Sequence, residues 1–129
     1  MILVDTSVWI ESFRRGGRRI DALVSLDDVV SYRAVCRKCY RDLMMIGRSA
    51  TPAPQCNALA QIESPLAASV FDEAVDLYRA ARKRGLTVRS SVDCLIAACA
   101  LRHDLEVLHR DRDYEALASV SLLRQRNTR

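Results

Sequence analysis

The sequence predicts an α/β domain whose centre is a mainly parallel β-sheet. Short apolar stretches alternate along the chain with longer segments of helical periodicity, which is the order that parallel strands and crossover helices produce. Several acidic residues stand where these predicted elements meet. The length of 129 residues, with 50% of them hydrophobic and 28% charged, fits one folded domain that covers residues 1–129.

The chain begins with a predicted strand followed by a predicted helix. Residues 1–4 are apolar and form a short buried strand, which ends at the first carboxylate. Thr6 or Ser7 can cap a helix that covers residue 8 to about residue 13. A Gly-Gly pair then ends this helix, because glycine is among the weakest helix formers.

Periodicity and capping residues predict seven further elements. They are a helix with Ile20, Leu23 and Val24 on one face, a strand over 28–31, a helix over 66–84, a helix from Ser90 or Ser91 to about Arg102, a strand over 105–108, a helix over 114 to about 119, and a final strand over 120–123. The helix over 66–84 has apolar residues at every third or fourth position, and Gly85 provides its C-terminal stop.

Charge and hydropathy narrow the class of protein. The formal net charge is +4, which is compatible with RNA as a partner but is not specific for it. The apolar N-terminal stretch is interrupted at Asp5, so it is too short for a secretion signal or a membrane span. A cytoplasmic protein without membrane association is therefore predicted.

The five cysteines do not predict disulfides in such a compartment. Cys36 and Cys39 form a C-x-x-C pair, but neither a second pair nor a nearby histidine accompanies them, so a zinc site is not expected. Cys94 and Cys99 lie in an alanine- and leucine-rich segment and are expected to be small buried hydrophobic residues.

Four acidic residues follow the predicted strands or begin the predicted helices. Asp5 ends the first strand, Asp93 lies in the first turn of a helix, and Asp111 and Asp113 follow the strand over 105–108. Strand carboxyl ends and the helix starts beside them share one edge of a parallel sheet, so these carboxylates are expected to face one another. A divalent cation would relieve their mutual repulsion, and hard oxygen ligands suit Mg²⁺ or Mn²⁺. Such a layout suits metal-dependent cleavage of phosphodiesters.

Each of these acids also has a purely structural interpretation. The alternatives are a strand end or helix cap for Asp5, a capping box with Ser90 for Asp93, a helix N-cap for Asp113, and a solvent-exposed ion pair with Arg110 or Arg112 for Asp111. His103 and His109 are expected at the surface or at helix ends. Composition and spacing leave both interpretations open.

Three motifs resemble those of the VapC-type PIN-domain ribonucleases. Residues 1–10 are Met-Ile-Leu-Val-Asp-Thr-Ser-Val-Trp-Ile, residues 87–98 are Thr-Val-Arg-Ser-Ser-Val-Asp-Cys-Leu-Ile-Ala-Ala, and residues 109–117 are His-Arg-Asp-Arg-Asp-Tyr-Glu-Ala-Leu. They occur in the family's order, and the resemblance covers about residues 1–30 and 65–125. It implies a three-layer α/β/α fold and an endoribonuclease that depends on Mg²⁺ or Mn²⁺. It also implies the toxin of a type II toxin–antitoxin pair, with a cognate antitoxin and a homodimer.

The resemblance also implies a role for each matching residue. Asp5 and Asp93 match the principal metal-binding acids, Asp111 a further metal-binding acid, and Asp113 an auxiliary catalytic acid of the same cluster, while Thr6 or Ser7 matches a supporting hydroxyl. The implied reaction is attack on an RNA phosphodiester by water that the metal activates. The candidates for contact with the RNA backbone are Arg89, Arg110 and Arg112.

The segment over residues 32–63 departs from the family pattern. The family has a further Glu there, in a motif such as Glu-x-Leu-x-Gly, and Asp42 is the sole acid between Asp28 and Glu63. The segment also lacks helical or strand periodicity, which is unusual for so long a stretch inside a small domain.

A shifted reading frame is one hypothesis for this departure. With suitable codons, residues 35–45 read from the third base of each codon can encode Val-x-Glu-Val-Leu-x-Gly-Phe-Asp-Asp, which restores the motif. A second, compensating shift near Ser64 is then required. The nucleotide sequence across codons 28–66 tests the hypothesis, because bases that cannot encode this peptide contradict it.

Two functions therefore follow from the sequence. The first is a Mg²⁺-dependent toxin ribonuclease with tRNA or ribosomal RNA as compatible targets. The alternative is a catalytically impaired PIN domain that binds RNA or an antitoxin as a scaffold, because this sequence lacks one acid that the family pattern includes.

Overall fold

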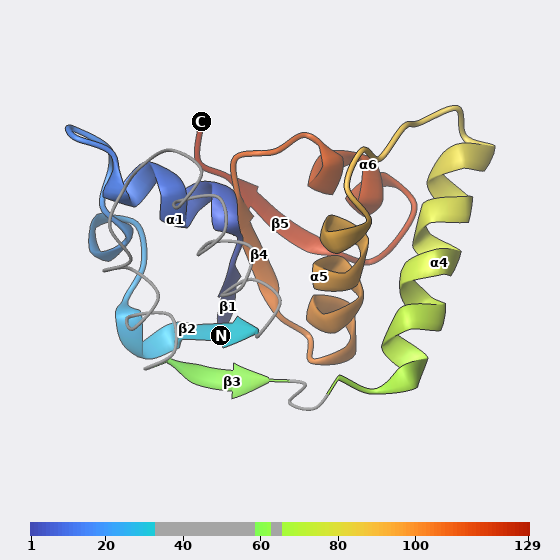
Figure 1. The fold of residues 1–129 in the computed structure, drawn as a ribbon, viewed down its shortest axis with the longest axis horizontal. Coiled ribbons are helices and arrows are strands. Elements are labelled where there is room, and N and C mark those ends of the chain that lie inside the picture. The colour runs from blue at the N-terminus through green and yellow to red at the C-terminus, as the bar shows by residue number, and fades with distance from the viewer. Residues whose placement is uncertain (33–58, 63–65) are drawn as a thin grey trace.

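A five-stranded sheet that is parallel throughout forms the centre of the computed structural model, which describes residues 1–32, 59–62 and 66–129 (Figure 1). The strands lie in the order β3-β2-β1-β4-β5. Their bounds are Ile2–Val4 (β1), Val29–Tyr32 (β2), Ala60–Ile62 (β3), Glu106–His109 (β4) and Arg124–Asn127 (β5). The predicted α/β class with a mainly parallel sheet is confirmed.

Helices cover both faces of this sheet. Helix α1 (Thr6–Phe13) lies on one face, while α4 (Ala68–Lys83), α5 (Ser91–Arg102) and α6 (Asp113–Ser119) lie on the other (Figure 1). The connection from β1 to β2 moves toward one edge of the sheet, and that from β4 to β5 moves toward the other. Because parallel crossovers are right-handed, the two connections must cross opposite faces. The three-layer α/β/α arrangement is therefore confirmed.

Helix α4 ends where the sequence predicts. It buries the four residues that recur at helical spacing, namely Val70, Ala74, Leu77 and Ala81. Gly85 follows with φ of +73°, a left-handed conformation that glycine adopts without a steric penalty. The Leu86 amide donates to the Ala81 carbonyl at 3.0 Å, which satisfies one of the last carbonyls of the helix.

Helix α5 is buried along most of its length, and it carries both cysteines of the described residues. Cys94 and Cys99 are buried in the core and form no disulfide with each other, as predicted. Burial, followed by the negative charges of Asp93 and Asp113, raises the pKa of the Cys94 thiol to about 11. Cys94 therefore behaves as a small hydrophobic residue at neutral pH.

The predicted helix around residues 20–24 is wrong. The chain forms a 3-10 helix over Ile20–Ala22 and a second one over Leu26–Asp28, and it then enters β2 directly. Ile20 is buried and Leu23 packs partly against the core, which explains the apolar spacing. So short a segment does not offset the cost of nucleating an α-helix.

The final strand lies four residues later than predicted. Residues 120–123 connect α6 to β5, and the strand itself is Arg124–Asn127. Arg126 donates to both carboxylate oxygens of Glu106 on the neighbouring β4, at 3.2 and 2.7 Å. Ion pairs of this kind allow an edge strand to be polar, so an apolar pattern did not mark it.

The atypical segment over residues 32–63 lies mostly outside the described residues. Its described part includes β3, a strand that the sequence did not predict, paired in parallel with β2. The missing Glu motif, the shifted-frame hypothesis and the Cys36–Cys39 pair all fall on residues 33–58, outside the described residues.

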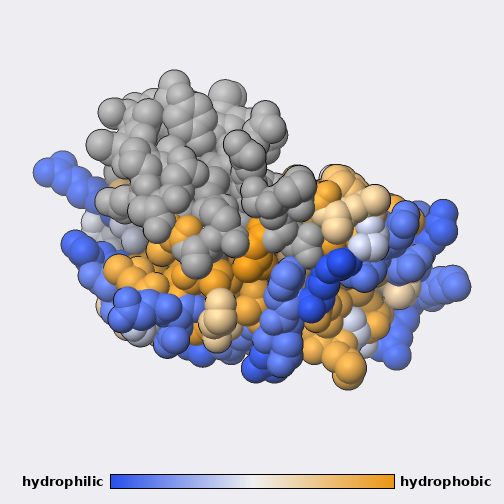
Figure 2. All heavy atoms as spheres, turned by 90° about the horizontal axis from the view of Figure 1, so that it is seen from below, coloured by the Kyte–Doolittle hydropathy of each residue, from blue (hydrophilic) through white to orange (hydrophobic). Residues whose placement is uncertain are grey.

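The surface is a mixture of polar and apolar side chains. Figure 2 shows hydrophobic residues in separate groups among hydrophilic ones when the molecule is seen from below. On α4, Phe71, Val75 and Tyr78 are exposed, so this helix buries one apolar stripe and presents a second one. Among the described helices, none has both the length and the apolar composition of a membrane span.

Truncation of a buried side chain on the interior strand β4 is expected to destabilise the fold. Leu108 on β4 is fully buried between β1 and β5. Leu108→Ala removes buried methyl groups and leaves a cavity, so we expect a loss of about 2–5 kcal/mol in the free energy of unfolding. Urea denaturation measures this loss.

Leu122→Ala is the matched control, because Leu122 is 92% exposed. We expect its unfolding free energy to stay within about 0.5 kcal/mol of the parent. Equal losses in the two variants would contradict the placement of Leu108 in the core.

Candidate active site

The central strand β1 and its neighbour β4 bring two of the predicted acids to the same edge of the sheet. The sheet order reverses between these strands, since β1 leads toward one edge and β4 toward the other. Asp5 directly follows β1, and Asp111 lies two residues beyond β4. The Asp5 amide donates to the Leu108 carbonyl at 2.9 Å, so the pairing continues to the point where the acids begin. Ligand sites of open parallel sheets form at this kind of switch point.

Asp5 is almost fully buried and its carboxylate is held on both sides. It is the N-cap of α1, and its Oδ2 accepts from the Ser7 amide at 2.9 Å and from the Ser7 hydroxyl. Its Oδ1 accepts from the Tyr114 hydroxyl at 2.7 Å. The prediction that Thr6 or Ser7 caps this helix is therefore wrong. The short side chain of Asp5, on extended backbone just before the helix, reaches the free amide first.

Of the two hydroxyls that the sequence left open, that of Ser7 contacts the Asp5 carboxylate. Its Oγ donates to Asp5 and accepts from the Arg110 amide at 3.1 Å. The hydroxyl thus links the start of α1 to the loop after β4. Thr6, the preceding residue, is buried.

Three other acids form a compact cluster. One carboxylate oxygen each from Asp93, Asp111 and Asp113 lies within 4.8 Å of the other two. Asp93 and Asp113 are buried, whereas the Asp111 side chain is one-third exposed. The cluster is therefore closed to solvent at Asp93 and Asp113 and accessible from solvent at Asp111.

Asp113 fixes the loop that precedes α5. It is the first residue of α6 and not its N-cap, which is Arg112. The Asp113 Oδ2 accepts from the backbone amides of Arg89 and Ser90, at 2.9 and 3.3 Å. The capping box predicted for Asp93 is not formed through Ser90, whose side chain makes no capping hydrogen bond. The start of α5 is held by an acid from another helix, so the local pattern was misleading.

Arg89 is the cation of this cluster. Its Nη2 lies 3.2 Å from the Asp111 Oδ1, and its Nε lies 3.6 Å from the Asp113 Oδ1. The alternative pairing of Asp111 with Arg110 or Arg112 is therefore wrong, because the loop turns the carboxylate toward the start of α5.

Tyr114 was not predicted as a site residue, yet it connects Asp5 to the other acids. Its side chain is fully buried. Burial, followed by the negative charges of Asp5, Asp93 and Asp111, holds the pKa of its hydroxyl well above the usual range. The hydroxyl therefore stays protonated and donates to Asp5. Its place directly after Asp113 was the one available signal in the sequence.

His109 corrects another expectation, because it is fully buried and not at the surface. Its ring lies 4.8 Å from the Tyr114 ring, between centroids. Its Nδ1 accepts from the Asp111 amide at 3.1 Å, and its Nε2 lies 2.6 Å from the Gln125 Oε1. This geometry assigns the ring proton to Nε2, since Nδ1 is the acceptor. His103, by contrast, ends α5 as its C-cap, as predicted.

The acid cluster fits a hard divalent cation. Three carboxylates within reach of one another supply oxygen ligands, which suit Mg²⁺ or Mn²⁺ better than soft metals. Asp5 lies outside this group of three. It is linked to the helix that carries Asp113, because Tyr114, the next residue of α6, donates to the Asp5 carboxylate.

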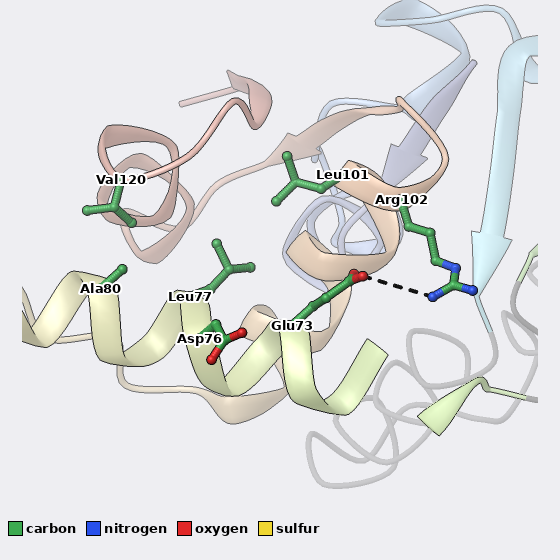
Figure 3. Close-up of a pocket in the computed structure, with 7 residues that line it drawn as sticks. All are labelled: Glu73, Asp76, Leu77, Ala80, Leu101, Arg102 and Val120. Atoms are coloured by element: carbon green, nitrogen blue, oxygen red, sulfur yellow. Dashed lines mark ion pairs between the residues drawn. The ribbon is translucent and has the colours of Figure 1, made fainter. Parts of the chain in front are cut away.

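A groove on another part of the molecule is separate from these acids. It has a volume of about 440 Å³. Figure 3 shows its lining, which is Glu73, Asp76, Leu77, Ala80, Leu101, Arg102 and Val120. The acid cluster holds the start of α5, and the groove lies at the end of that helix, about 12 Å away along its axis. None of the four predicted acids lines the groove. The candidate site is therefore identified by its grouped carboxylates and not by the presence of a groove.

Comparisons with known proteins agree with this arrangement. The PIN domain model matches residues 2–120. A VapC ribonuclease of Mycobacterium bovis and Ribonuclease VapC11 of Mycobacterium tuberculosis are each 34% identical over 131 aligned positions, covering 95% of this chain and 96% of the relative.

Solved structures show the same fold at lower identity. The structure of VapBC2 from Rickettsia felis bound to a promoter DNA fragment matches with a TM-score of 0.75 at 14% identity, covering all of both chains. The FitAcB structure from Neisseria gonorrhoeae matches with a TM-score of 0.69 at 19% identity, covering 98% of this chain and 97% of that one.

Removal of the Tyr114 hydroxyl is expected to destabilise the protein. Tyr114→Phe deprives the buried Asp5 carboxylate of a donor, so we expect a loss of about 1.5–3 kcal/mol at pH 7. Tyr78→Phe is the control, because Tyr78 is 40% exposed. Equal losses by urea denaturation would contradict the role of this hydrogen bond.

The same variant is expected to change the pH dependence of stability. The pKa of Tyr114 is raised in the folded chain, so above pH of about 10 the unfolded chain alone releases this proton. Its contribution is therefore complete below that pH and declines above it, by up to about 1.4 kcal/mol per pH unit. Curves of the free energy of unfolding against pH should fall more steeply between pH 9 and 11 for the parent than for Tyr114→Phe. Parallel curves would contradict the assignment.

Proposed function

This chain belongs to the PIN-domain family, and on that basis we propose that it is a metal-dependent endoribonuclease, the toxin of a type II toxin–antitoxin pair. The observation that carries the proposal is the grouping of Asp93, Asp111 and Asp113 at the edge of the sheet where β1 ends in Asp5. Two relatives that are 34% identical over 95% of this chain are named ribonucleases.

We propose Mg²⁺ as the ion, with Mn²⁺ as a substitute, and Asp5, Asp93 and Asp111 as the residues that would hold it. When bound, such an ion activates water and stabilises the negative charge that develops on a phosphodiester. The cost of gathering carboxylates is lowered at the same time, because the ion neutralises them. Hard oxygen ligands and the partial exposure of Asp111 support this assignment.

The chain's own residues prepare the site. Tyr114 and Ser7 donate to opposite oxygens of Asp5 and fix its orientation. Asp113 acts as an auxiliary acid, because its bonds to the Arg89 and Ser90 amides hold the first turn of α5, from which Asp93 projects. Pre-orientation of this kind reduces the reorganisation needed during reaction.

RNA and a cognate antitoxin are the proposed partners. The net charge of +4 favours a polyanionic substrate, and tRNA and ribosomal RNA are both compatible. A toxin–antitoxin complex from Klebsiella pneumoniae is among the solved structures with the same fold. A homodimer, a single domain and a cytoplasmic location complete the proposal, and light scattering of the purified protein measures the first of these.

The nuclease proposal is tested by RNA cleavage with purified protein. We expect degradation of total tRNA or ribosomal RNA with Mg²⁺ or Mn²⁺ and none with a chelator. Asp5→Asn and Asp93→Asn should each reduce the rate by at least about 100-fold, because each removes a charge from the site. The rate is followed on denaturing gels.

Asp72→Asn is the matched control, since Asp72 is an exposed acid on α4, away from the cluster. Its cleavage rate should equal that of the parent. RNA or antitoxin binding without any chelator-sensitive cleavage would replace the nuclease with the scaffold alternative, and cleavage that survives Asp93→Asn would point to a contaminating enzyme.

A further inference from the structure

Arg89 is attached to the acid cluster through both its main chain and its side chain. Its amide donates to the Asp113 Oδ2 at 2.9 Å. Its guanidinium extends over the cluster, with Nη2 3.2 Å from the Asp111 Oδ1 and Nε 3.6 Å from the Asp113 Oδ1. One positive charge therefore lies against two of the three acids that are grouped for a metal ion.

The two ion pairs differ in how much the acid depends on Arg89. Asp113 is buried and also accepts from the Arg89 and Ser90 amides, so it keeps these donors if the guanidinium leaves. Asp111 is one-third exposed and accepts from the Asp113 amide at 3.1 Å besides the guanidinium. The Arg89 side chain is itself 58% exposed, so water screens its pairing and the side chain has room to swing out.

A guanidinium and a divalent ion repel each other when both sit on the same carboxylate. Their charges of one and two units would lie only a few ångströms apart on the Asp111 oxygens. An ion bound by Asp93 and Asp111 must therefore weaken or replace the contact between Arg89 and Asp111. The loss of that contact opposes metal binding.

We propose that Arg89 is an internal counter-ion that competes with the divalent metal for Asp111 and so sets the metal concentration at which the site fills. This inference rests on the proposed function, because it requires the acid cluster to be the metal site. Arg89 is a positioning residue here, since it acts through Asp111. With the metal absent, Arg89 neutralises the cluster and limits repulsion among its carboxylates.

The test is the binding of Mn²⁺ to the purified full chain without RNA, measured by titration calorimetry. Arg89→Ala removes the competing charge and should lower the Mn²⁺ Kd by about 3- to 10-fold, as expected for a partly screened pair. Arg89→Lys keeps the charge but loses the planar group that spans two carboxylates. Its Mn²⁺ Kd should therefore lie between those of the parent and Arg89→Ala.

Arg112→Ala is the matched control, because Arg112 is exposed and lies between Asp111 and Asp113 in the chain. It removes the same charge but leaves the Arg89 contacts in place, so its Mn²⁺ Kd should change by less than about 2-fold. Equal tightening in Arg112→Ala and Arg89→Ala would overturn the proposal, because general charge would then explain both. An unchanged or higher Mn²⁺ Kd in Arg89→Ala would also overturn the proposal.

Two further measurements separate this inference from the proposed function. Asp111→Asn should weaken Mn²⁺ binding strongly, and if it does not, or if the parent binds no Mn²⁺, the metal site itself is wrong and the inference falls with it. Metal binding that depends on Asp111 but does not change when Arg89 is substituted would contradict the inference about Arg89 and leave the proposed metal site in place. A thermal melt checks folding, and Arg89→Gln, with the same expected direction, takes the place of Arg89→Ala if that variant does not melt cooperatively.

Discussion

The pairing of β1 with β4 is the constraint on which the site depends. Leu3 lies opposite Val107 and Val4 opposite Leu108, so the next residue, Asp5, emerges beside the loop that carries Asp111. A slip of one residue in this register would turn the side chains of the shifted strand to the opposite face of the sheet. The core therefore specifies the register, and the register places the acids.

Burial of carboxylates at this edge is costly unless each one has partners. Asp5 accepts from Ser7 and Tyr114, and Asp113 accepts from two backbone amides. These donors come from separate elements, so the contacts that satisfy the acids also tie α1, α5 and α6 together. The same hydrogen bonds therefore stabilise the fold and fix the geometry of the site. Partial exposure of Asp111 leaves one side of the cluster open to an ion and a substrate.

Elements with strong local signals were predicted well. The helices over residues 68–83 and 91–102 and the strands at residues 2–4 and 106–109 were predicted to within two residues of each end. Predictions failed where long-range contacts replaced local pattern. The apolar spacing around Ile20 reflects packing of a 3-10 turn, the edge strand β5 relies on ion pairs such as Arg126–Glu106, and His109 is buried because β4 is central.

The sequence by itself determined the order of the acids, the parallel α/β class and hence the convergence of Asp5, Asp93 and Asp111 at one edge, because the carboxyl ends of parallel strands meet there. Only the tertiary structure decided how the acids are held. Tyr114 meets Asp5 across 109 positions, and Arg89 meets Asp113 across 24. Periodicity and capping rules describe contacts within a few residues, so partners at these separations become visible only when the sheet brings the loops together.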